Sequence, residues 1–533
     1  MQKVDILNTP VFSSTPEENV LFCDFGKHAF AVLEIEGECD TATEVTLSVG
    51  EVKTCGRINR APGGSRIYQE QTVTLSPGKN FVKMEMSHAG YNNGTLTITP
   101  NAVPFRYAEV RGKVKNLKVF QHAYFGHFDD DGADFKSSSP VLDRLWEFCK
   151  YTMKATTPFG IFIDGNRERQ AYEGDTYINQ LGYFVCTSDS EIARNTVDRL
   201  FTYPTWPTEW RLSMIPIIHD YALYTGDLAS VEKWYDRLKE NLLLDGMNED
   251  HLLNARGLES IPGSIGINNV PIPVRDIVDW PAPERDGYEM AEVNLVPNCW
   301  FYMALCRMAE IAKLLNKTTE AEAMLEQAAK TRQSIRSKML KNGLFTDNPE
   351  SNHTALHSCV FPVLWNIAEY DEKKQILELM RSKGMACSVF VSQFLLECCY
   401  LNGLADYGLE LMLSDGKRSW NNMINCGATI AMEAWDDSFK PNQDWNHPWG
   451  AAPGNIIVRH LAGIRPLEPG FKKFSVEPQP ASLEYFKIKT PTPHGGITLE
   501  MSSPGKYTLT VPPETCAVFK GREYFSGCHS LQD

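Results

Sequence analysis

The sequence predicts a multidomain protein of α and β structure, in which a central barrel of paired helices lies between an N-terminal β-sandwich and a small C-terminal β-domain. Three observations predict this fold class: alternating apolar and polar residues before residue 137, a helical period in the middle of the chain, and renewed alternation near the C-terminal end. A chain of 533 residues is also too long for one ordinary core. We therefore expect three domains: 1–136, 137–463 and 464–533.

Short alternating runs separated by turn residues fill both ends of the chain. Near the start, EVTLSVGEV and TLTITP place every second side chain on the same face, which is typical of half-buried strands. Near the end, KKFSVEPQ, GGITLEMS and KYTLTVPP do the same. An antiparallel sandwich accommodates such strands, so both end domains are predicted to be β.

The middle of the chain has a helical period that begins with PVLDRLWEFCKYTMKA. Because the helices follow one another in pairs with short connections, we favour two helical rings closed into a barrel over an open bundle. One connection, residues 246–289, is rich in Gly and Pro and is long enough to suggest a functional role. The further helices are expected over residues 175–186, 188–201, 210–225, 228–243, 289–315, 317–340, 353–367, 370–384, 387–402, 404–414, 424–433 and 450–462.

Charge and cysteine usage limit the function classes. The net charge of −15 opposes binding to nucleic acid and to anionic membranes, and no apolar stretch approaches the length of a membrane span. The 14 cysteines form no CxxC pair and no zinc-like Cys/His cluster, so we expect free thiols and no metal site, with some disulfides left open by the even count. No cofactor is expected. Free thiols and an N-terminus without an apolar signal region suggest the cytoplasm, although a trimmed signal would leave the periplasm open.

The densest group of charged residues is IDGNRERQAYEGD, which follows the apolar run FGIFI and ends at Asp175. Neighbouring carboxylates raise one another's pKa and adjacent arginines lower it, so such a group can hold one acid protonated and keep others ionised. The alternative is a solvated, salt-bridged helix start with Asp175 as its N-cap. The residue types alone do not separate these two interpretations.

A second candidate group is INCGATIAMEAWDDS, in which Glu433 is the lone carboxylate at the end of an apolar run. Burying a carboxylate costs free energy unless the group has a partner or a task. The segment DWNHPWG follows, and its His447 is either a ligand-binding residue or a core histidine. Glycoside hydrolysis needs two carboxyl groups, one to protonate the leaving oxygen and one to activate water or to attack. A barrel that closes its last helices onto its first would bring the two groups together.

At these residues the chain resembles the α-L-rhamnosidases of glycoside hydrolase family 78. The stretch DGNRERQAYEGD (164–175) resembles the acidic motif of that family, and GATIAMEAW (427–435) resembles its Gly-Ala-Thr-x-x-x-Glu-x-Trp motif. Supporting matches extend the resemblance over nearly the whole chain: FRYAEVRG, LYTGD, NHPWG and GIRPLEPGFKKFSVEPQP, of which the last is rather specific and LYTGD is weak. The resemblance implies an (α/α)6 barrel and inverting hydrolysis of a terminal α-L-rhamnose.

The resemblance also implies residue roles. Glu168 corresponds to the general acid and Glu433 to the general base that activates water. Contacts with the sugar hydroxyls are implied for Asp164, Arg167 and Asp175, and a hydrogen bond to a hydroxyl or to the catalytic carboxylate is implied for His447. Asp279 and Trp280 resemble the Asp-Trp pair that lines the sugar site in the family. An aromatic wall is implied for Tyr172, Trp280, Trp435 and one of Trp206 and Trp210.

Two departures from the family pattern leave alternatives open. The stretch between Asp164 and Glu168 is shorter than usual, and Tyr172 stands where the family has a tryptophan. The chain could therefore act on a different terminal sugar, or be a carbohydrate-binding relative that has lost catalysis, although both carboxylates are retained. In each case the expected partner is a small carbohydrate or glycoside, and formation of a homodimer stays open.

Overall fold

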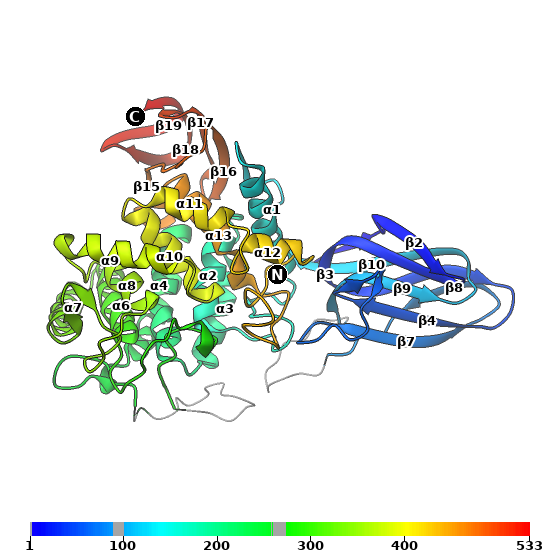
Figure 1. Ribbon diagram of the computed structural model, residues 1–533. Coiled ribbons are helices and arrows are strands. Elements are labelled where there is room, and N and C mark those ends of the chain that lie inside the picture. Colours follow the sequence, from blue (N-terminus) through cyan, green and yellow to red (C-terminus); the bar gives the residue numbers. More distant parts are fainter. Residues whose placement is uncertain (1–2, 89–100, 257, 259–272) are drawn as a thin grey trace.

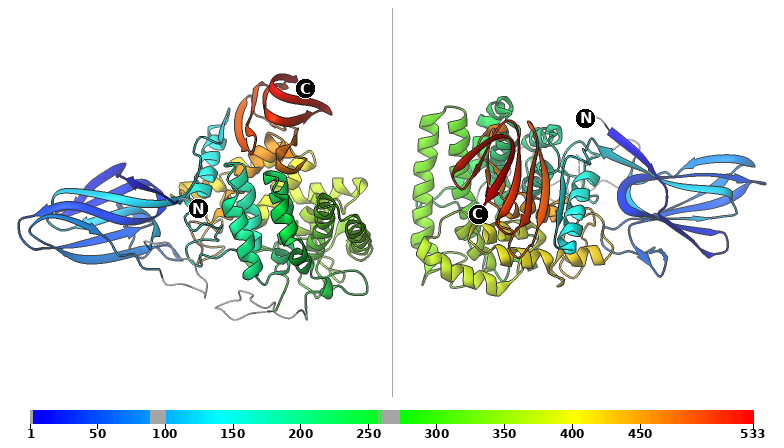
Figure 2. Two further views of the ribbon diagram at one scale, coloured as in Figure 1. Left: turned by 180° about the vertical axis from the view of Figure 1, so that it is seen from behind. Right: turned by 90° about the horizontal axis from the view of Figure 1, so that it is seen from above.

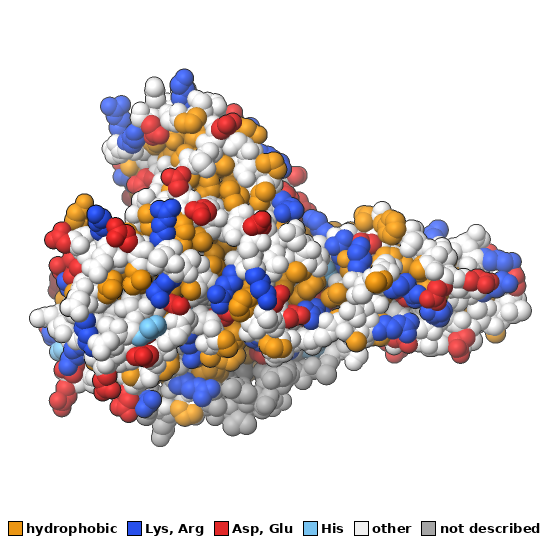
Figure 3. Space-filling view, viewed as in Figure 1, with side chains coloured by type: hydrophobic (Ala, Val, Ile, Leu, Met, Phe, Trp, Pro, Cys, Tyr) orange, Lys and Arg blue, Asp and Glu red, His pale blue; other side chains and the backbone are white. Residues whose placement is uncertain are grey.

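The computed structural model describes residues 3–88, 101–256, 258 and 273–533. An elongated β region projects from one side of a helical region, and a second, smaller β region packs on another side of the helices (Figures 1 and 2). All 14 cysteines carry free thiols, and most of them are buried, as expected. On the face in Figure 3, basic and acidic side chains are interspersed. Among the described residues, the helices are too short or too polar to cross a bilayer.

The N-terminal region is built around one long strand. Its strands are β1 Lys3–Asn8, β2 Phe12–Glu17, β3 Val20–Cys39, β4 Thr43–Gly50, β5 Lys53–Thr54, β6 Arg57–Ile58, β7 Tyr68–Leu75, β8 Gly78–Lys83, β9 Val103–Arg111 and β10 Lys115–Gly126. The first part of β3 pairs with β2 and β9 and its last part with β8 and β10, all antiparallel. Strand order is β1-β10-β3-β9-β4-β7. The alternation in β4 buries Val45, Leu47 and Val49 in the core.

Buried and amphipathic helices alternate along the helical region. The helices are α1 Pro140–Ala155, α2 Glu173–Phe184, α3 Glu191–Thr202, α4 Thr208–Thr225, α5 Leu228–Lys239, α6 Leu295–Leu314, α7 Thr318–Met339, α8 Leu356–Leu364, α9 Tyr370–Lys383, α10 Val389–Leu401, α11 Ala405–Leu413, α12 Trp420–Asn425 and α13 Ala452–Ile456. From α2 to α10, the even-numbered helices are buried on most sides, whereas α3, α5, α7 and α9 expose one face. Because a helix that is apolar all round needs protein all round, this alternation separates inner helices from outer ones.

The C-terminal sheet recruits a strand from before the helices. It contains β11 Asp134–Ser137, β14 Ile464–Pro466, β15 Lys473–Val476, β16 Phe486–Thr492, β17 Gly495–Ser503, β18 Lys506–Phe519 and β19 Arg522–Gln532. Strand β11 pairs antiparallel with β16, and Ser139 then caps α1, whose first residue is Pro140. The expected boundary at residue 136 therefore falls inside a strand of the C-terminal sheet, because a short strand far from its partner in sequence carries no local signal of that pairing.

Two segments differ from regular helix or strand. The predicted helix over 424–433 is wrong, since α12 ends at Asn425 and an irregular segment, 426–447, follows it. Gly427 has a φ of 100°, which ends the helical geometry. In the predicted connection 246–289, residues 257 and 259–272 lie outside the described part, and the described part contains only short 3₁₀ turns, such as Ala282–Glu284.

Candidate active site

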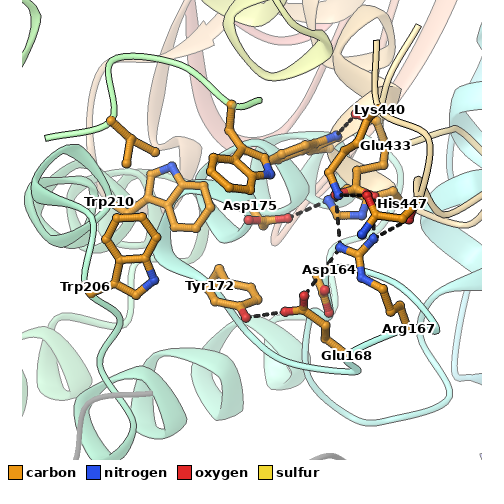
Figure 4. A pocket seen from close by; sticks show the side chains of 14 residues that line it. Asp164, Arg167, Glu168, Tyr172, Asp175, Trp206, Trp210, Glu433, Lys440 and His447 are labelled. Carbon is orange, nitrogen blue, oxygen red and sulfur yellow. Dashed lines mark hydrogen bonds and ion pairs between the residues drawn. The ribbon is translucent and has the colours of Figure 1, made fainter. Parts of the chain in front are cut away.

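One cavity of about 260 Å³ brings together residues from both ends of the helical region. It lies between the loop that precedes α2, the start of α4, the connection before α6 and the segment 426–447 (Figure 4). Its lining comprises Asp164, Arg167, Glu168, Tyr172, Asp175, Trp206, Trp210, Ile277, Trp280, Glu433, Lys440, Asn442, His447 and Trp449. Ten of the twelve residues singled out from the sequence therefore line a single cavity.

The loop before α2 is closed by its own backbone. Asp164 N–H donates to Gln170 O, and Gln170 N–H donates to Asp164 Oδ1, both at 2.8 Å. Between these ends Arg169 adopts a φ of 52°, and its N–H donates to Gly165 O. This tight loop presents Arg167 to the cavity next to Glu168.

The segment 426–447 presents Glu433 from the opposite side. Glu433 N–H donates to Asp444 O, and Asp444 N–H donates back to Glu433 Oε2, both at 3.0 Å. The indole of Trp449 donates to the carbonyl oxygen of Glu433 at 3.0 Å. Backbone and side chain of Glu433 are thus both fixed, and its side chain is only 2% exposed.

Two cations surround the Glu433 carboxylate. Arg167 reaches both of its oxygens at 3.2 Å, and Lys440 Nζ lies 2.9 Å from Oε1. Burial alone would raise the pKa of Glu433, but Arg167, His447 and Lys440 outweigh it and lower that pKa to about 2. Glu433 is therefore ionised at neutral pH.

Glu168 faces Glu433 across the same arginine. Arg167 Nη2 lies 3.4 Å from Glu168 Oε1 and 3.2 Å from Glu433 Oε1, so these two oxygens are no farther apart than the sum of the two distances (Figure 4). The hydroxyl of Tyr172 donates to the other oxygen of Glu168. The two proposed catalytic carboxylates therefore share one cavity but have different partners, two cations for Glu433 and one cation with a phenol for Glu168.

Two further carboxyl groups have raised pKa values. Burial raises the pKa of Asp164 well above its ordinary value, and Glu168, Asp175 and Asp444 add to the effect. Burial also raises the pKa of Asp175, although His447 Nε2, 2.8 Å from Asp175 Oδ1, acts in the opposite direction. These groups supply hydrogen-bond donors and acceptors at the floor of the cavity.

Asp164, Asp444 and His447 form the described group that comes nearest to a cation site, since one ligand atom from each lies within 4.8 Å of the others. Each of these residues already has a protein partner, because Asp164 accepts from Gln170 N–H, Asp444 accepts from Arg167 N–H, and His447 pairs with Asp175. The expectation of no metal stays a prediction from the sequence.

Indole and phenol rings form one wall. Trp206 and Trp210 both line the cavity, where the sequence had left the choice between them open, and Trp210 lies 5.5 Å from the ring of Tyr172. Trp280 lines the same cavity, and Figure 4 shows the rings of Trp206, Trp210 and Tyr172 close together. Such a wall offers apolar area to one face of a bound ring.

Asp279 and Trp435 lie outside the lining. The carboxylate of Asp279 accepts hydrogen bonds from His357 Nε2 at 2.7 Å and from Ser388 N–H at 3.0 Å, so it fixes the loop that carries Trp280. Trp435 is fully buried, and its indole donates to Cys387 O. The expectation that Trp435 forms part of the sugar wall is corrected: Trp449 of the segment NHPWG lies there instead.

The sequence reasoning assigned no role to four lining residues, Ile277, Lys440, Asn442 and Trp449. Trp449 and Ile277 each lie close in sequence to a residue that was assigned. Lys440 and Asn442 lie between MEAWDD and DWNHPWG, two stretches that the sequence had already singled out. That position could have indicated that both residues line the cavity.

A buried carboxylate, Glu433, and a half-buried one, Glu168, face one cavity walled by aromatic rings on a framework of paired helices, which is the kind of site that glycoside hydrolases use. The comparison with family models agrees. Residues 130–461 match the bacterial alpha-L-rhamnosidase 6 hairpin glycosidase domain, and residues 463–520 match the bacterial alpha-L-rhamnosidase C-terminal domain. The chain belongs to the bacterial α-L-rhamnosidase family, and the six-hairpin description fits the (α/α)6 barrel expected from the sequence.

Individual relatives are distant in sequence and similar in fold. An alpha-L-rhamnosidase of Alteromonas sp. (strain LOR) is 23% identical over 99% of this chain and 58% of its own length. The family 78 rhamnosidase of Bacillus sp. GL1 gives a TM-score of 0.74 at 18% identity, over 94% of this chain and 53% of that one. A Klebsiella oxytoca rhamnosidase with rhamnose bound gives 0.65 at 14%, over 86% and 96%. The chain thus spans little more than half the length of the first two relatives.

Proposed function

We propose that this protein hydrolyses a terminal α-L-rhamnose from a glycoside or oligosaccharide. The observation that carries the proposal is the pairing of Glu168 and Glu433 around one cavity, where Glu433 lies beside two cations and Glu168 beside one cation and a phenol. Family membership supports rhamnose as the sugar, and the Klebsiella relative was solved with rhamnose bound.

In this proposal Glu168 protonates the leaving oxygen and Glu433 activates water on the opposite face of the sugar, which inverts the anomeric configuration. The low pKa of Glu433 keeps it ready to accept a proton. Asp164, Arg167 and Asp175 bind hydroxyl groups, and the rings of Trp206 and Trp210 pack against the sugar and its methyl group.

Glu168→Gln and Glu433→Gln test the two roles. We expect Glu433→Gln to lower kcat/KM by about 10²–10⁴-fold for every rhamnoside. Glu168→Gln should lower it equally for an alkyl rhamnoside but much less for a dinitrophenyl rhamnoside, whose leaving group needs no proton. Glu326→Gln, on the exposed face of α7, is the matched control. Equal and near-native rates in both active-site variants would contradict the assignment.

The stereochemical course has its own measurement. Inverting carboxyl pairs lie about 6.5–9.5 Å apart and retaining pairs about 5–5.5 Å apart, and the limit set by Arg167 admits both the retaining range and the lower end of the inverting range. Proton NMR of the first product therefore decides: β-L-rhamnose as the initial anomer supports inversion, and α-L-rhamnose contradicts it.

A second candidate is hydrolysis of another terminal sugar, favoured by one observation. Tyr172 stands where the family pattern has a tryptophan. Its hydroxyl donates a hydrogen bond to Glu168, and its ring is smaller than an indole. A panel of aryl glycosides separates the candidates, because cleavage of a different sugar without cleavage of the rhamnoside would favour this one.

We also propose that the inner and outer helices close as an (α/α)6 barrel between an N-terminal β-sandwich and the C-terminal β-domain. The alternation of buried and amphipathic helices from α2 to α10 supports two concentric layers. In this arrangement the last helices meet the first, as the shared cavity requires.

A further inference from the structure

Lys440 is a buried cation that the proposed mechanism does not use. Its side chain is 7% exposed, and its Nζ lies 2.9 Å from Glu433 Oε1 and 3.2 Å from Asn442 Oδ1. Burying a lysine costs free energy unless it is paired, so its position beside a catalytic carboxylate calls for a reason beyond stability.

The backbone holds Lys440 in place on both sides. Lys440 N–H donates to Asp436 O, and Gln443 N–H donates to Lys440 O. Asp437, which lies shortly before Lys440 in the chain, is tied to the N-terminal region because it accepts two hydrogen bonds from Arg66, at 2.7 and 2.8 Å. The lysine is therefore presented to Glu433 by a fixed turn rather than by a free surface chain.

The two cations at Glu433 differ in how they are shared. Arg167 divides its guanidinium between Glu433, Glu168 and the carbonyl oxygen of Asn442, which lies 2.5 Å from Nη1. Among the described carboxylates, Lys440 pairs with Glu433 alone. Lys440 can therefore stabilise the charge of one carboxylate without stabilising that of the other.

We propose that Lys440 is a positioning residue that keeps Glu433 ionised and oriented for water activation; this inference rests on the function proposed above. Glu433 lies among groups that have opposite effects on its protonation. The charged and titratable groups that face it are Arg167, Glu168, Asp175, Lys440, Asp444 and His447. With burial and three acidic neighbours favouring the neutral form, removing one of the two close cations lets the proton return to Glu433.

Lys440→Met tests this through the pH dependence of kcat/KM. We expect the acidic limb to move up by about 1–3 pH units, with kcat recovering at higher pH and KM little changed, and Lys440→Arg to restore the limb. Lys417→Met is the matched control, since Lys417 also lies 2.9 Å from a carboxylate, that of Asp436, but is half exposed and outside the cavity. A loss that is independent of pH, or an unmoved limb, would overturn the proposal.

A second measurement does not depend on turnover. In protein carrying ¹³C at the glutamate carboxyl carbons, with Glu433→Gln to assign the signal, Glu433 should remain ionised at every pH where the native protein is folded. In Lys440→Met the same signal should titrate within that range. If the Glu433 signal of Lys440→Met does not titrate in that range, Lys440 has no such role, whichever sugar the enzyme cleaves. If the signal does titrate but the native protein cleaves no rhamnoside, only the proposed function fails.

Discussion

Gly174, in the first turn of α2, shows how a single hydrogen atom shapes the cavity wall. A Cβ at this position would lie 2.3 Å from two atoms of the Trp210 indole. Alanine would favour the helix by about 1 kcal/mol, but overpacking a rigid ring costs about 1–3 kcal/mol. We expect Gly174→Ala to displace Trp210 and to weaken rhamnose binding, measured by calorimetry, with little loss of folded protein.

Gly182→Ala on the same helix is the control. There the added Cβ meets the Met153 side chain at 2.9 Å, and a thioether chain adjusts more easily than an indole. Equal weakening of rhamnose binding in both variants would show that the helix, and not the ring, carries the effect.

The sequence placed the two candidate carboxylates in the cavity better than it placed the rings around them. Glu168 and Glu433 each lie in a distinctive motif, and both line the cavity. Trp435 lies in the irregular segment and Trp449 just after it, in the 3₁₀ turn Pro448–Ala451, and both carry the same indole. Their destinations differ because Trp435 finds Cys387 O and Trp449 finds the carbonyl oxygen of Glu433, and these are tertiary contacts that no local pattern encodes.

At the scale of elements, the segment 426–447 explains why a helix was predicted where none exists. GATIAM is mostly apolar and mostly buried, so it has no period that separates helix from irregular chain. The segment is held instead by a contact from α1, in which Ala431 N–H donates to Thr152 Oγ1, and by one between its own distant residues, in which His447 N–H donates to Ala431 O. Because both partners are far from Ala431 in sequence, the local pattern could not reveal them.

Gly427→Ala tests whether the turn at the start of this segment places Glu433. The position has open space for a Cβ but a φ of 100°, so the change strains the backbone alone, at about 1–3 kcal/mol. We expect a lower unfolding midpoint together with a fall in kcat. Gly403→Ala is the control: it has the same open space with a φ of 76°, directly after α10, and should lower stability without lowering kcat. An unchanged kcat in Gly427→Ala would separate the turn from catalysis.

At the scale of the whole molecule, the N-terminal β region contacts the segment 426–447, which carries Glu433. His28 N–H donates to Thr429 Oγ1 at 2.8 Å, and the amide of Asn446 donates to Glu51 Oε1 at 3.1 Å. Asn446 in turn accepts from Asn166 N–H, in the loop of Glu168. The sequence predicted the separate domains but not these contacts, because their partners lie hundreds of residues apart.

Glu51 makes this contact dependent on pH. Burial raises its pKa from 4.5 to about 8, with Asp444 adding to the effect and Ile67 N–H, Asn446 and Arg66 opposing it. Between these two values the folded protein holds a proton that the unfolded chain has lost, so this group makes stability fall as pH rises from about 4.5 to about 8. A tenfold change in proton affinity corresponds to about 1.4 kcal/mol, so the effect amounts to several kcal/mol.

Glu51→Gln imitates the protonated acid and should remove this dependence. We expect the thermal midpoint of the variant to exceed that of the native protein increasingly from pH 5 to pH 8, and the two to converge near pH 4.5. Glu109→Gln is a control of opposite sign. Burial alone would raise the pKa of Glu109, but Arg57 outweighs it and lowers that pKa, so this variant should be less stable than the native protein at neutral pH and approach it in acid. If Glu51→Gln instead lowered the midpoint most at pH 8, the carboxylate would be ionised in the folded protein, and the link between the β region and the segment 426–447 would be a charged one.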